Sequence, residues 1–481
     1  MRASGVRDVT RTRLAWAAYA VVAAALALLG VSHWLWAVAL RGPVLYGEGA
    51  VAHAAILARD RWEYTTGASV GDVNALRPLF TAANYPPLYF HLAGIGDDPF
   101  VTGRIFSIAA TLFVAGAIAW RARPAGVLVA AAIALAWLGS VPVLEWGSAV
   151  KPDLVALAFT VGAVVALDRS HPRHALAGVL VAVAAMAKPT ALLPALAMFV
   201  FVARSDPRAA LRALGSGLVA AVIVAELTHG PDKLFKIHVV DWNALAWHFD
   251  LAVSLVVLAL VLLAVPLVTI AVTRPSRTVV TAYAVGAFGI VLLGGREGAT
   301  INYLLDLSAA IALAVAGRAP LLAVRARSPL AALAQAAVAV FLLNPFGIIP
   351  GRAVNTGAWG DPARIAAVAA IPGTLLIEDS GLLVANGREP LVDDVFLWSR
   401  NRAREVAEHF SFREGEQLLN AVRSGKFDAV VTEVDLASLD QTGGFERQRW
   451  HPDLVTAILA RYQLRPADDT GGPVLFVYDR R

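Results

Sequence analysis

The sequence predicts an α-helical protein that crosses a membrane about eleven times and ends in a small α/β domain outside it. Of its 481 residues, 58% are hydrophobic and only 16% are charged, whereas about a quarter of the residues in soluble proteins are charged. The apolar residues gather in long runs, and the first run, from residue 13 to residue 40, is long enough to cross a bilayer. After about residue 353 such runs stop and charge rises. We therefore expect a membrane domain over 1–352 and an exported domain over 353–481.

Apolar segments of the membrane domain are expected to form the spans. Two of them, 154–167 and 175–187, would be only about 20 Å long at 1.5 Å per residue. A third short segment follows Lys188-Pro189 directly. Short, proline-interrupted helices are tolerated where they line a protein cavity, and Pro189 should push Lys188 out of helical geometry. The expected spans are 14–40, 102–120, 125–142, 154–167, 175–187, 190–203, 211–228, 251–273, 278–294, 303–317 and 329–343.

Arginines occupy every second connection between these spans, and few acids accompany them. Such positive connections stay in the cytoplasm, so we expect a cytoplasmic amino terminus and, after eleven spans, an extracytoplasmic carboxyl terminus. These arginines also account for most of the net charge of +5. No basic stripe interleaved with aromatic residues is present, so nucleic-acid binding is not expected. The arginines are Arg2, Arg7, Arg11, Arg13, Arg121, Arg123, Arg169, Arg173, Arg204, Arg208, Arg212, Arg274, Arg277, Arg318, Arg325 and Arg327.

The remaining connections carry acids, lysine, histidine and arginine together. Ionisable groups at a membrane edge are costly unless they have a role, so we expect the chemistry at the outer face. The chain has no cysteine, which excludes disulfides, thiol nucleophiles and thiolate metal sites. The ionisable residues of these connections are Glu48, Glu145, Lys151, Asp153, Lys188, Asp241, His248, Arg296 and Glu297.

Two outer segments are long, 41–101 and 229–250. The stretch 49–61 in the first is amphipathic and is expected to lie in the membrane interface. The aromatic end of the second, around Trp242 and Trp247, is typical of the headgroup level. In the exported domain, the pattern predicts strands and helices in alternation, which is typical of an α/β fold. The predicted strands are 374–379, 427–434 and 473–478, and the predicted helices are 402–410, 415–424 and 452–462.

Two carboxylates of the outer connections are candidate catalytic groups. Glu48 lies between two glycines, which would let a ligand approach the backbone closely. Asp153 follows Lys151-Pro152 at the start of a short span, with Glu145 nearby in the same connection. Each carboxylate could instead stabilise the start of a helix. If the two meet over a cavity, one could deprotonate a hydroxyl nucleophile. A divalent cation is the weaker alternative, since no histidine-rich spacing supports a metal site.

Lys188 is the most informative cation. A lysine in an apolar hairpin needs an anionic partner or water, and a phosphate would provide one, with Arg296 or Arg104 as a second ligand. Snorkelling of Lys188 to the interface is the alternative. Arg296 could likewise pair with Glu297, and His248 is more simply explained as an interface residue.

The order of these segments resembles the GT-C glycosyltransferases, integral membrane enzymes that use polyprenyl-phosphate sugars. The resemblance covers most of the chain and is strongest to the bacterial branch near the protein O-mannosyltransferases and the aminoarabinose transferase. Two departures are the single acid in Gly-Glu-Gly and Asn84 before the Tyr-Pro-Pro motif. The matching motifs are Glu48, Tyr-Pro-Pro-Leu-Tyr-Phe at 85–90, Gly-Arg-Ile-Phe-Ser at 103–107, Lys-Pro-Asp-Leu at 151–154, Ala-Lys-Pro-Thr at 187–190 and Asn-Tyr-Leu-Leu-Asp at 302–306.

This resemblance implies a glycosyltransferase at the outer face of a bacterial cytoplasmic membrane. The donor would be a polyprenyl-phosphate sugar, with its phosphate near Lys188, Arg296 and Arg104. Glu48 would be the general base and Asp153 would orient acceptor or sugar. The acceptor would be a glycan, a lipid-linked saccharide or a protein. The expected substrate-binding residues are Tyr85, Lys151, Glu145, His248, Asn302 and Tyr303.

Two other functions remain open from the sequence. A transporter or flippase of lipid-linked saccharides needs the same lipid cavity but no base. It should carry ionisable residues near mid-membrane and often shows inverted repeats, whereas in this chain the charges lie at outer ends and no repeat is visible. A non-catalytic scaffold for envelope assembly is the third possibility.

Overall fold

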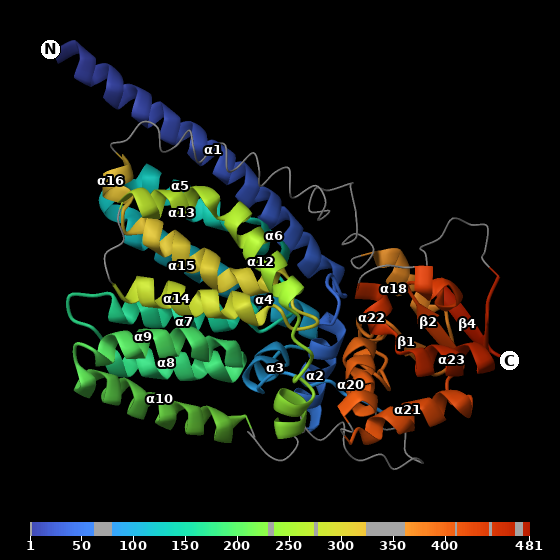
Figure 1. Ribbon diagram of the computed structural model, residues 1–481. Coiled ribbons are helices and arrows are strands. Elements are labelled where there is room, and N and C mark those ends of the chain that lie inside the picture. The colour runs from blue at the N-terminus through green and yellow to red at the C-terminus, as the bar shows by residue number, and fades with distance from the viewer. Residues whose placement is uncertain are drawn as a thin grey trace. The chain divides into compact units, whose positions relative to one another are not determined.

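The computed structural model describes residues 2–61, 79–228, 235–273, 278–323, 361–408, 411–441, 445–466 and 475–481. The described chain divides into two units (Figure 1). The helical unit contains residues 1–38, 104–228 and 246–355, and the sheet unit contains 39–103, 229–245 and 356–481. The expected span 329–343 and the expected domain boundary after residue 352 lie outside the described residues, as do Arg274, Arg277, Arg325 and Arg327.

The helical unit is a bundle of apolar helices, and ten of the expected spans coincide with them. Among the described residues, three helices are long and apolar enough to cross a membrane, and a fourth span results if the bent pair α12 and α13 is counted as one. The count of eleven spans stays a prediction. The helices are α1 (Arg2–Leu40), α4 (Pro99–Ala122), α5 (Val127–Leu138), α6 (Val141–Trp146), α7 (Asp153–Leu167), α8 (His174–Ala187), α9 (Leu192–Ala203), α10 (Pro207–Leu227), α12 (Phe249–Leu262), α13 (Ala264–Thr273), α14 (Val279–Leu293), α15 (Leu305–Ala316) and α16 (Ala319–Ala323), with short 3₁₀ turns η1 (Arg123–Ala125), η2 (Pro189–Ala191) and η4 (Ile301–Leu304).

Prolines break this bundle where the candidate site needs irregular backbone. The pair α12 and α13 bends by 70° around Leu263, because Pro266 lacks an N–H and its ring would clash with the carbonyl four residues earlier. Pro189 separates α8 from α9, and Lys188 before it is extended, with φ −149° and ψ 118°. The expectation that Pro189 removes Lys188 from helical geometry is therefore confirmed.

Glycines allow the closest helix contacts in the bundle. A Cβ on Gly178 of α8 would lie 1.9 Å from the carbonyl oxygen of Ala213 in α10, and one on Gly286 of α14 would lie 2.3 Å from Cα of Pro194 in α9. Small residues at such contacts bring helix backbones together where the hydrophobic effect does not drive helix association. These contacts pack α8 against α10 and α14 against α9, and α7 packs against α8 (Figure 1).

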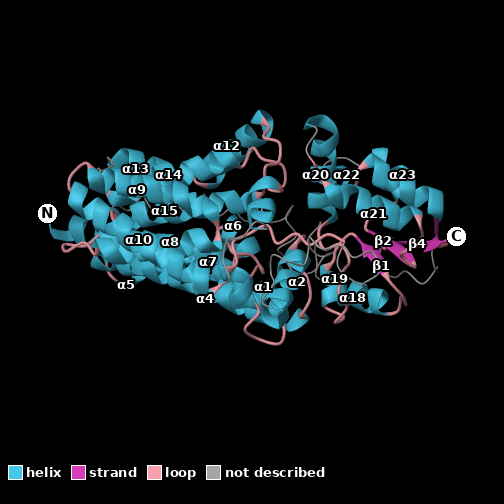
Figure 2. Cartoon of the chain, turned by 90° about the horizontal axis from the view of Figure 1, so that it is seen from below, coloured by secondary structure: helices cyan, strands magenta, loops and turns pink. Residues whose placement is uncertain are grey.

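The sheet unit is built on a mixed four-stranded sheet in the order β1-β2-β4-β3 (Figure 2). Strands β1 (Leu375–Ile377) and β2 (Ala429–Thr432) are parallel, with Leu376 opposite Val430, and β4 (Phe476–Arg480) is antiparallel to both β2 and β3 (Tyr462–Leu464). The sequence predicted β1, β2 and β4 near their observed positions but not β3. The helices and turns of this unit are α2 (Glu48–Arg61), α3 (Leu88–Ala93), a π-helical turn η3 (Lys236–Asp241), α18 (Pro362–Ala369), α19 (Gly381–Val384), α20 (Val395–Glu408), α21 (Arg413–Arg423), η5 (Leu436–Gln441), α22 (Phe445–Arg449) and α23 (Pro452–Arg461).

All three segments of the sheet unit, 39–103, 229–245 and 356–481, contribute side chains to its hydrophobic core. Phe80, Trp242 and Phe412 pack together with ring centroids 4.7–6.0 Å apart, and Ala50 of α2 belongs to the same core. The expectation that 49–61 lies in the membrane interface is wrong, because most described side chains of α2 are buried and the helix packs on α3 and α19. Trp242 is likewise a core residue, 2% exposed, rather than an interface aromatic.

Orientation can be tested with single cysteines, because the chain has none of its own. Ser170 lies in an arginine-bearing connection and Ser424 lies beyond α21, and both are exposed. In intact cells an impermeant thiol reagent should label Ser424→Cys and should label Ser170→Cys only after the membrane is opened. Labelling of both variants from the same side would contradict the expected orientation.

Candidate functional site

The ammonium group of Lys188 lies inside the helical unit rather than at its surface. Because Lys188 occupies the break between α8 and η2, its side chain leaves the α8 helix axis, and the residue is only 8% exposed. Its Nζ lies 2.5 Å from Oδ1 of Asp153. The snorkelling alternative is therefore wrong for Lys188, which has a buried anionic partner.

Asp153 is the centre of this cluster. It is the first residue of α7 and is 4% exposed. Its Oδ1 accepts hydrogen bonds from Lys188 Nζ and, at 2.8 Å, from Asn302 Nδ2. Its Oδ2 is buried and has no hydrogen-bond partner among the described residues. Asp153 is therefore not a hydrogen-bonding cap for its own helix, and the cap interpretation is wrong.

Tyr303 brings the two predicted phosphate-binding cations together. Lys188 Nζ lies 5.0 Å from the centre of the Tyr303 ring, and an Arg296 N–H donates to the Tyr303 hydroxyl at 3.0 Å. Both residues reach Tyr303 because η4 places it beside α14 and α15. Asn302 and Tyr303 thus connect Asp153, Lys188 and Arg296 into one cluster, hereafter the Asp153 cluster.

A small hollow beside the cluster is lined by further residues that the sequence analysis did not predict as site residues. Asp306 and Thr160 line it together with Asp153 and Lys188. Asp306 Oδ1 accepts a hydrogen bond from the Tyr283 hydroxyl at 3.1 Å. Asp306 could have been identified as a site residue because it lies about one helical turn after Asn302. No feature of the local sequence identifies Tyr283 as one.

The other predicted residues of the helical unit lie around this cluster or away from it. Glu145 belongs to α6, which packs against η4, and its Oε2 is buried without a hydrogen-bond partner in the described part of the chain. Lys151 is buried in the connection before Asp153. Arg104 is fully buried in α4 and donates to the carbonyl of Ala37 at 2.9 Å. His248 is half exposed, and its imidazole pairs with the Glu297 carboxylate at 3.3 Å rather than with Asp153.

Glu48 is a fully buried carboxylate of the sheet unit. It begins α2, and its Oε2 accepts from the backbone N–H groups of Val44 at 2.6 Å and Leu45 at 3.3 Å. Gly49 lets α19 approach closely, because a Cβ there would lie 2.1 Å from the Gly381 nitrogen. The carboxylate is thus held in one orientation at the start of the helix, where it also complements the helix dipole. The shared cavity of Glu48 and Asp153 stays a prediction.

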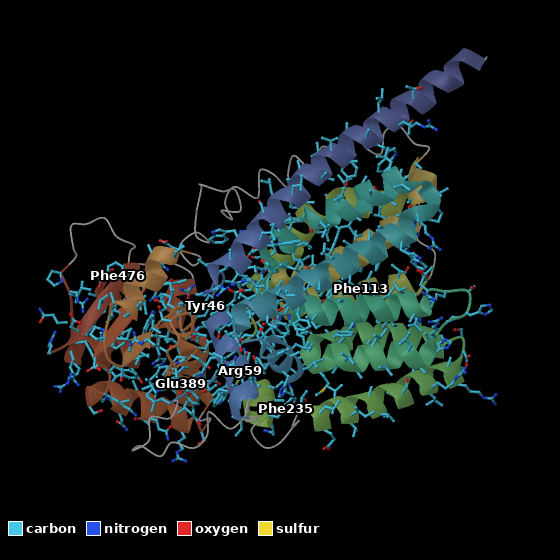
Figure 3. The ribbon with its side chains drawn as sticks, turned by 180° about the vertical axis from the view of Figure 1, so that it is seen from behind. Tyr46, Arg59, Phe113, Phe235, Glu389 and Phe476 are labelled. Carbon is cyan, nitrogen blue, oxygen red and sulfur yellow. The ribbon has the colours of Figure 1, made fainter. Side chains whose placement is uncertain are left out.

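A network of buried charges lies in the same unit as Glu48. Arg449 binds Glu378 at 2.8 Å and Glu433 at 3.0 Å, and its guanidinium stacks 4.4 Å from the ring centre of Tyr46. Tyr46 is labelled in Figure 3. Asp379 next to it has a buried Oδ2 without a hydrogen-bond partner among the described residues. Burial raises the pKa of Asp379 well above its usual value, and the charges of Glu433 and Glu48 raise it further.

The remaining predictions concern substrate contact and metal. Tyr85 is partly buried in the loop before α3, and its role as a substrate-binding residue stays a prediction. In the described residues no group of three or more His, Asp or Glu side chains could hold a metal ion.

A double-mutant cycle tests the Asp153–Lys188 pair. Removing one partner of a buried ion pair leaves an uncompensated charge and costs about 3–5 kcal/mol. Lys188→Met and Asp153→Asn should therefore each lower the free energy of unfolding by about that amount, and the double variant should recover most of the loss. The measurement is denaturation of the purified protein in detergent.

The partly exposed His248–Glu297 pair serves as control, and its coupling free energy should be less than about 1 kcal/mol. Additive effects at 153 and 188 would contradict the pairing.

The raised pKa of Asp379 predicts a pH dependence of stability. The folded protein keeps a proton on Asp379 that the unfolded chain releases near pH 4. This contribution to stability is complete below about pH 4 and is lost as the pH rises toward the raised pKa. Asp379→Asn should remove the loss, so its Tm relative to wild type should increase between pH 4.5 and pH 8. Asp440→Asn, at a side chain that is 94% exposed, should show no such trend. A constant Tm difference for Asp379→Asn would contradict the raised pKa.

Comparison with solved structures identifies proteins with a similar fold. No protein-family model matches the chain, and no curated protein matches its sequence. The structure is similar to that of ArnT from Cupriavidus metallidurans in the apo state, with a TM-score of 0.53 and 16% identity over 94% of this chain and 97% of ArnT. The same protein bound to undecaprenyl phosphate gives a TM-score of 0.52 and 17% identity, with the same coverage. An oligosaccharyltransferase from Archaeoglobus fulgidus gives a TM-score of 0.41 and 12% identity, over 94% of this chain and 73% of that one.

ArnT is an aminoarabinose transferase of the GT-C superfamily. The similarity extends along almost all of both chains, so it includes the helical unit and the sheet unit alike. The GT-C resemblance expected from the sequence is therefore confirmed for the fold: the chain has the fold of the GT-C aminoarabinose transferase ArnT.

Proposed function

We propose that this protein is a membrane glycosyltransferase that transfers a sugar from a polyprenyl-phosphate donor to an acceptor at the outer face of a bacterial cytoplasmic membrane. The observation that carries the proposal is the Asp153 cluster, a buried group of charged and hydrogen-bonding side chains in a chain with the ArnT fold. Buried charges among apolar helices are costly and are retained where they bind or react.

Lys188 and Arg296 are proposed to bind the donor phosphate. An ammonium has three N–H donors, and Asp153 is the only hydrogen-bond acceptor for Lys188 among the described residues. Asp153 therefore holds Lys188 charged and oriented while leaving donors for phosphate oxygens. Arg296, on the hydroxyl side of Tyr303, would add a second cation. ArnT was crystallised with undecaprenyl phosphate, which supports the same class of donor for this chain. Arg104 is a weaker candidate, since one of its N–H groups already binds Ala37.

An apolar cavity supports a lipid donor. It has a volume of about 160 Å³ and lies among α1, α5, α12, α13 and α15. Its lining includes Trp16 and Tyr19 of α1 and reaches Leu304, the residue after Tyr303. The part of a polyprenyl chain next to the phosphate would occupy this cavity, with the phosphate at the Asp153 cluster. The apolar tail would then contact apolar side chains and the anion would contact cations.

The two carboxylates are proposed to act on the acceptor and the sugar. Glu48 would be the general base, because its backbone hydrogen bonds hold the buried carboxylate in one orientation. Asp153 would orient the sugar or the acceptor through Oδ2, which lacks a partner in the described part of the chain. Asn302, Tyr303, Tyr85, Lys151, Glu145 and His248 are proposed to contribute to the surrounding substrate site.

Transfer by purified variants in lipid tests this proposal. A positioned general base contributes about 10²–10⁴-fold to rate, and Glu48→Gln keeps the hydrogen bonds from Val44 and Leu45 while removing the base. Transfer should therefore fall by that factor while binding of polyprenyl-phosphate sugar is retained. Lys188→Met/Asp153→Asn, which restores charge balance, should fold but not transfer. Glu408→Gln on the exposed face of α20 is the control.

Product formation, followed by mass with a panel of polyprenyl-phosphate sugars, decides between the functions. Full activity of the Lys188→Met/Asp153→Asn double variant would contradict a role for the cluster in transfer. Undiminished transfer by Glu48→Gln would remove Glu48 as the base. Movement of lipid-linked saccharide across the bilayer, with no new glycosidic bond from any donor, would identify a flippase, and neither activity would favour a scaffold.

A further inference from the structure

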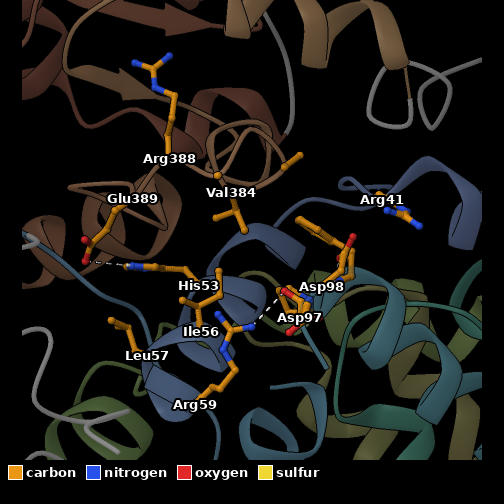
Figure 4. A pocket seen from close by; sticks show the side chains of 14 residues that line it. Arg41, His53, Ile56, Leu57, Arg59, Asp97, Asp98, Val384, Arg388 and Glu389 are labelled. Atoms are coloured by element: carbon orange, nitrogen blue, oxygen red, sulfur yellow. Dashed lines mark hydrogen bonds and ion pairs between the residues drawn. The ribbon is translucent and has the colours of Figure 1, made fainter. Parts of the chain in front are cut away.

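A second, polar cavity lies entirely within the sheet unit (Figure 4). Its volume is about 560 Å³, within the range of about 300–1,000 Å³ that is usual for small-molecule sites. It is formed by α2, the start of α4 and the segment after α19, and it shares no lining residue with the Asp153 cluster or its lipid cavity. The charged side chains of its lining are Arg41, Arg59, Arg388, Asp97, Asp98 and Glu389.

The charges of this cavity balance. The lining includes three arginines and three carboxylates, so their formal charges cancel and no net field would select an anion or a cation. Part of this capacity is used internally: Arg59 donates to the carbonyls of Gly96 and Asp97 at 3.1 and 3.0 Å, and Arg388 donates to backbone carbonyls of 368, 371 and 373. Arg59 and Arg388 are therefore held by backbone carbonyls, which leaves fewer of their N–H donors for a phosphate or other anionic ligand.

His53 lines this cavity, and one of its two ring nitrogens has no hydrogen-bond partner among the described residues. It is 1% exposed, and its Nδ1 lies 3.0 Å from Asp393 Oδ2. Its Nε2 is buried without a hydrogen-bond partner among the described residues, and the nearest carboxylate oxygen, Glu389 Oε1, is 3.8 Å away. Figure 4 shows the two side chains facing each other from opposite walls. Burial alone would lower the pKa of His53, and the carboxylates of Asp393 and Glu389 reverse this and raise it.

The separation of 3.8 Å is too long for a direct hydrogen bond but suits a bridging hydroxyl. An oxygen about 2.8 Å from each atom would lie beside the line that joins them, accepting from Nε2–H of the protonated His53 imidazole and donating to Glu389 Oε1. A hydroxyl can do both at once, whereas a phosphate would bring its negative charge against the Glu389 carboxylate and an ammonium cannot accept. Apolar side chains of Ile56, Leu57 and Val384 supply a wall beside this position for C–H groups.

We propose that this cavity is a binding site for a neutral saccharide, with one sugar hydroxyl bridging His53 and Glu389. The site is distinct from the proposed donor site and does not depend on transferase activity. A neutral sugar combines many hydroxyls with apolar ring faces, which is what a charge-balanced cavity with an apolar wall recognises.

Saturation-transfer NMR on the full-length protein in detergent tests the proposal without any donor. The probes are neutral disaccharides of gluco-, galacto-, manno- and arabino-configuration, with inorganic phosphate as the charged comparison. At least one disaccharide should bind wild type in competition with others of the set. Ile56→Trp, which fills the cavity and leaves the His53–Asp393 pair intact, should abolish the signal, whereas Val406→Trp on the exposed surface of α20 should not.

A second pair of variants tests the hydroxyl bridge itself. Glu389→Ala removes one side of the bridge at a partly exposed position and should weaken Kd about tenfold or more. Glu416→Gln, at an exposed acid of α21, should leave Kd unchanged. Saccharide binding that survives Ile56→Trp, the absence of binding by every disaccharide, or binding of phosphate in place of saccharide would each overturn the proposal. Because no transfer is measured, failure of saccharide binding leaves the proposed transferase function standing, and the reverse also holds.

Discussion

The buried ion pair between Asp153 and Lys188 is the constraint on which the candidate site depends. Two charges inside an apolar bundle are stable only if they remain together and share further hydrogen bonds. The chain meets this requirement by ending α8 at Pro189, which turns Lys188 inward, and by starting α7 at Asp153. Asn302 and Tyr303 on η4 complete the cluster. Close glycine contacts pack α8 against α10, through Gly178, and α14 against α9, through Gly286.

Pairing and function place opposite demands on Lys188. A lysine committed wholly to Asp153 would be a structural ion pair, and an unpaired lysine at this depth would lose its proton or destabilise the fold. One hydrogen bond to Asp153 leaves the ammonium charged with donors to spare. Glu48 is likewise held in one orientation, by the backbone N–H groups of Val44 and Leu45. Both residues are therefore oriented before any substrate arrives, which lowers the cost of binding it.

Sequence reasoning predicted the features that local chemistry controls. The apolar runs, the break at Lys188-Pro189 and three of the four strands follow from hydrophobicity and proline geometry, and the GT-C motifs predicted the fold. Contacts between segments far apart in the sequence could not be predicted in this way. The local sequence of α2 does not show that it is a core helix, because an amphipathic sequence is also typical of an interfacial helix. Only the packing of α3 and α19 on α2 shows that it is buried. Likewise, Asp153 has the sequence position of a helix cap, and only the fold of α8 and η4 brings it the partners that make it a cluster.

The most direct test of this account is the position of a donor phosphate in the bound state. A cryo-EM structure of the protein in lipid nanodiscs with undecaprenyl phosphate would show it. The account predicts phosphate oxygens within hydrogen-bond distance of Lys188 Nζ and the Arg296 guanidinium, with the Asp153–Lys188 contact retained and the prenyl chain in the apolar cavity of α1, α5 and α15. A phosphate bound away from both cations, with the Asp153 cluster unchanged and closed, would contradict it.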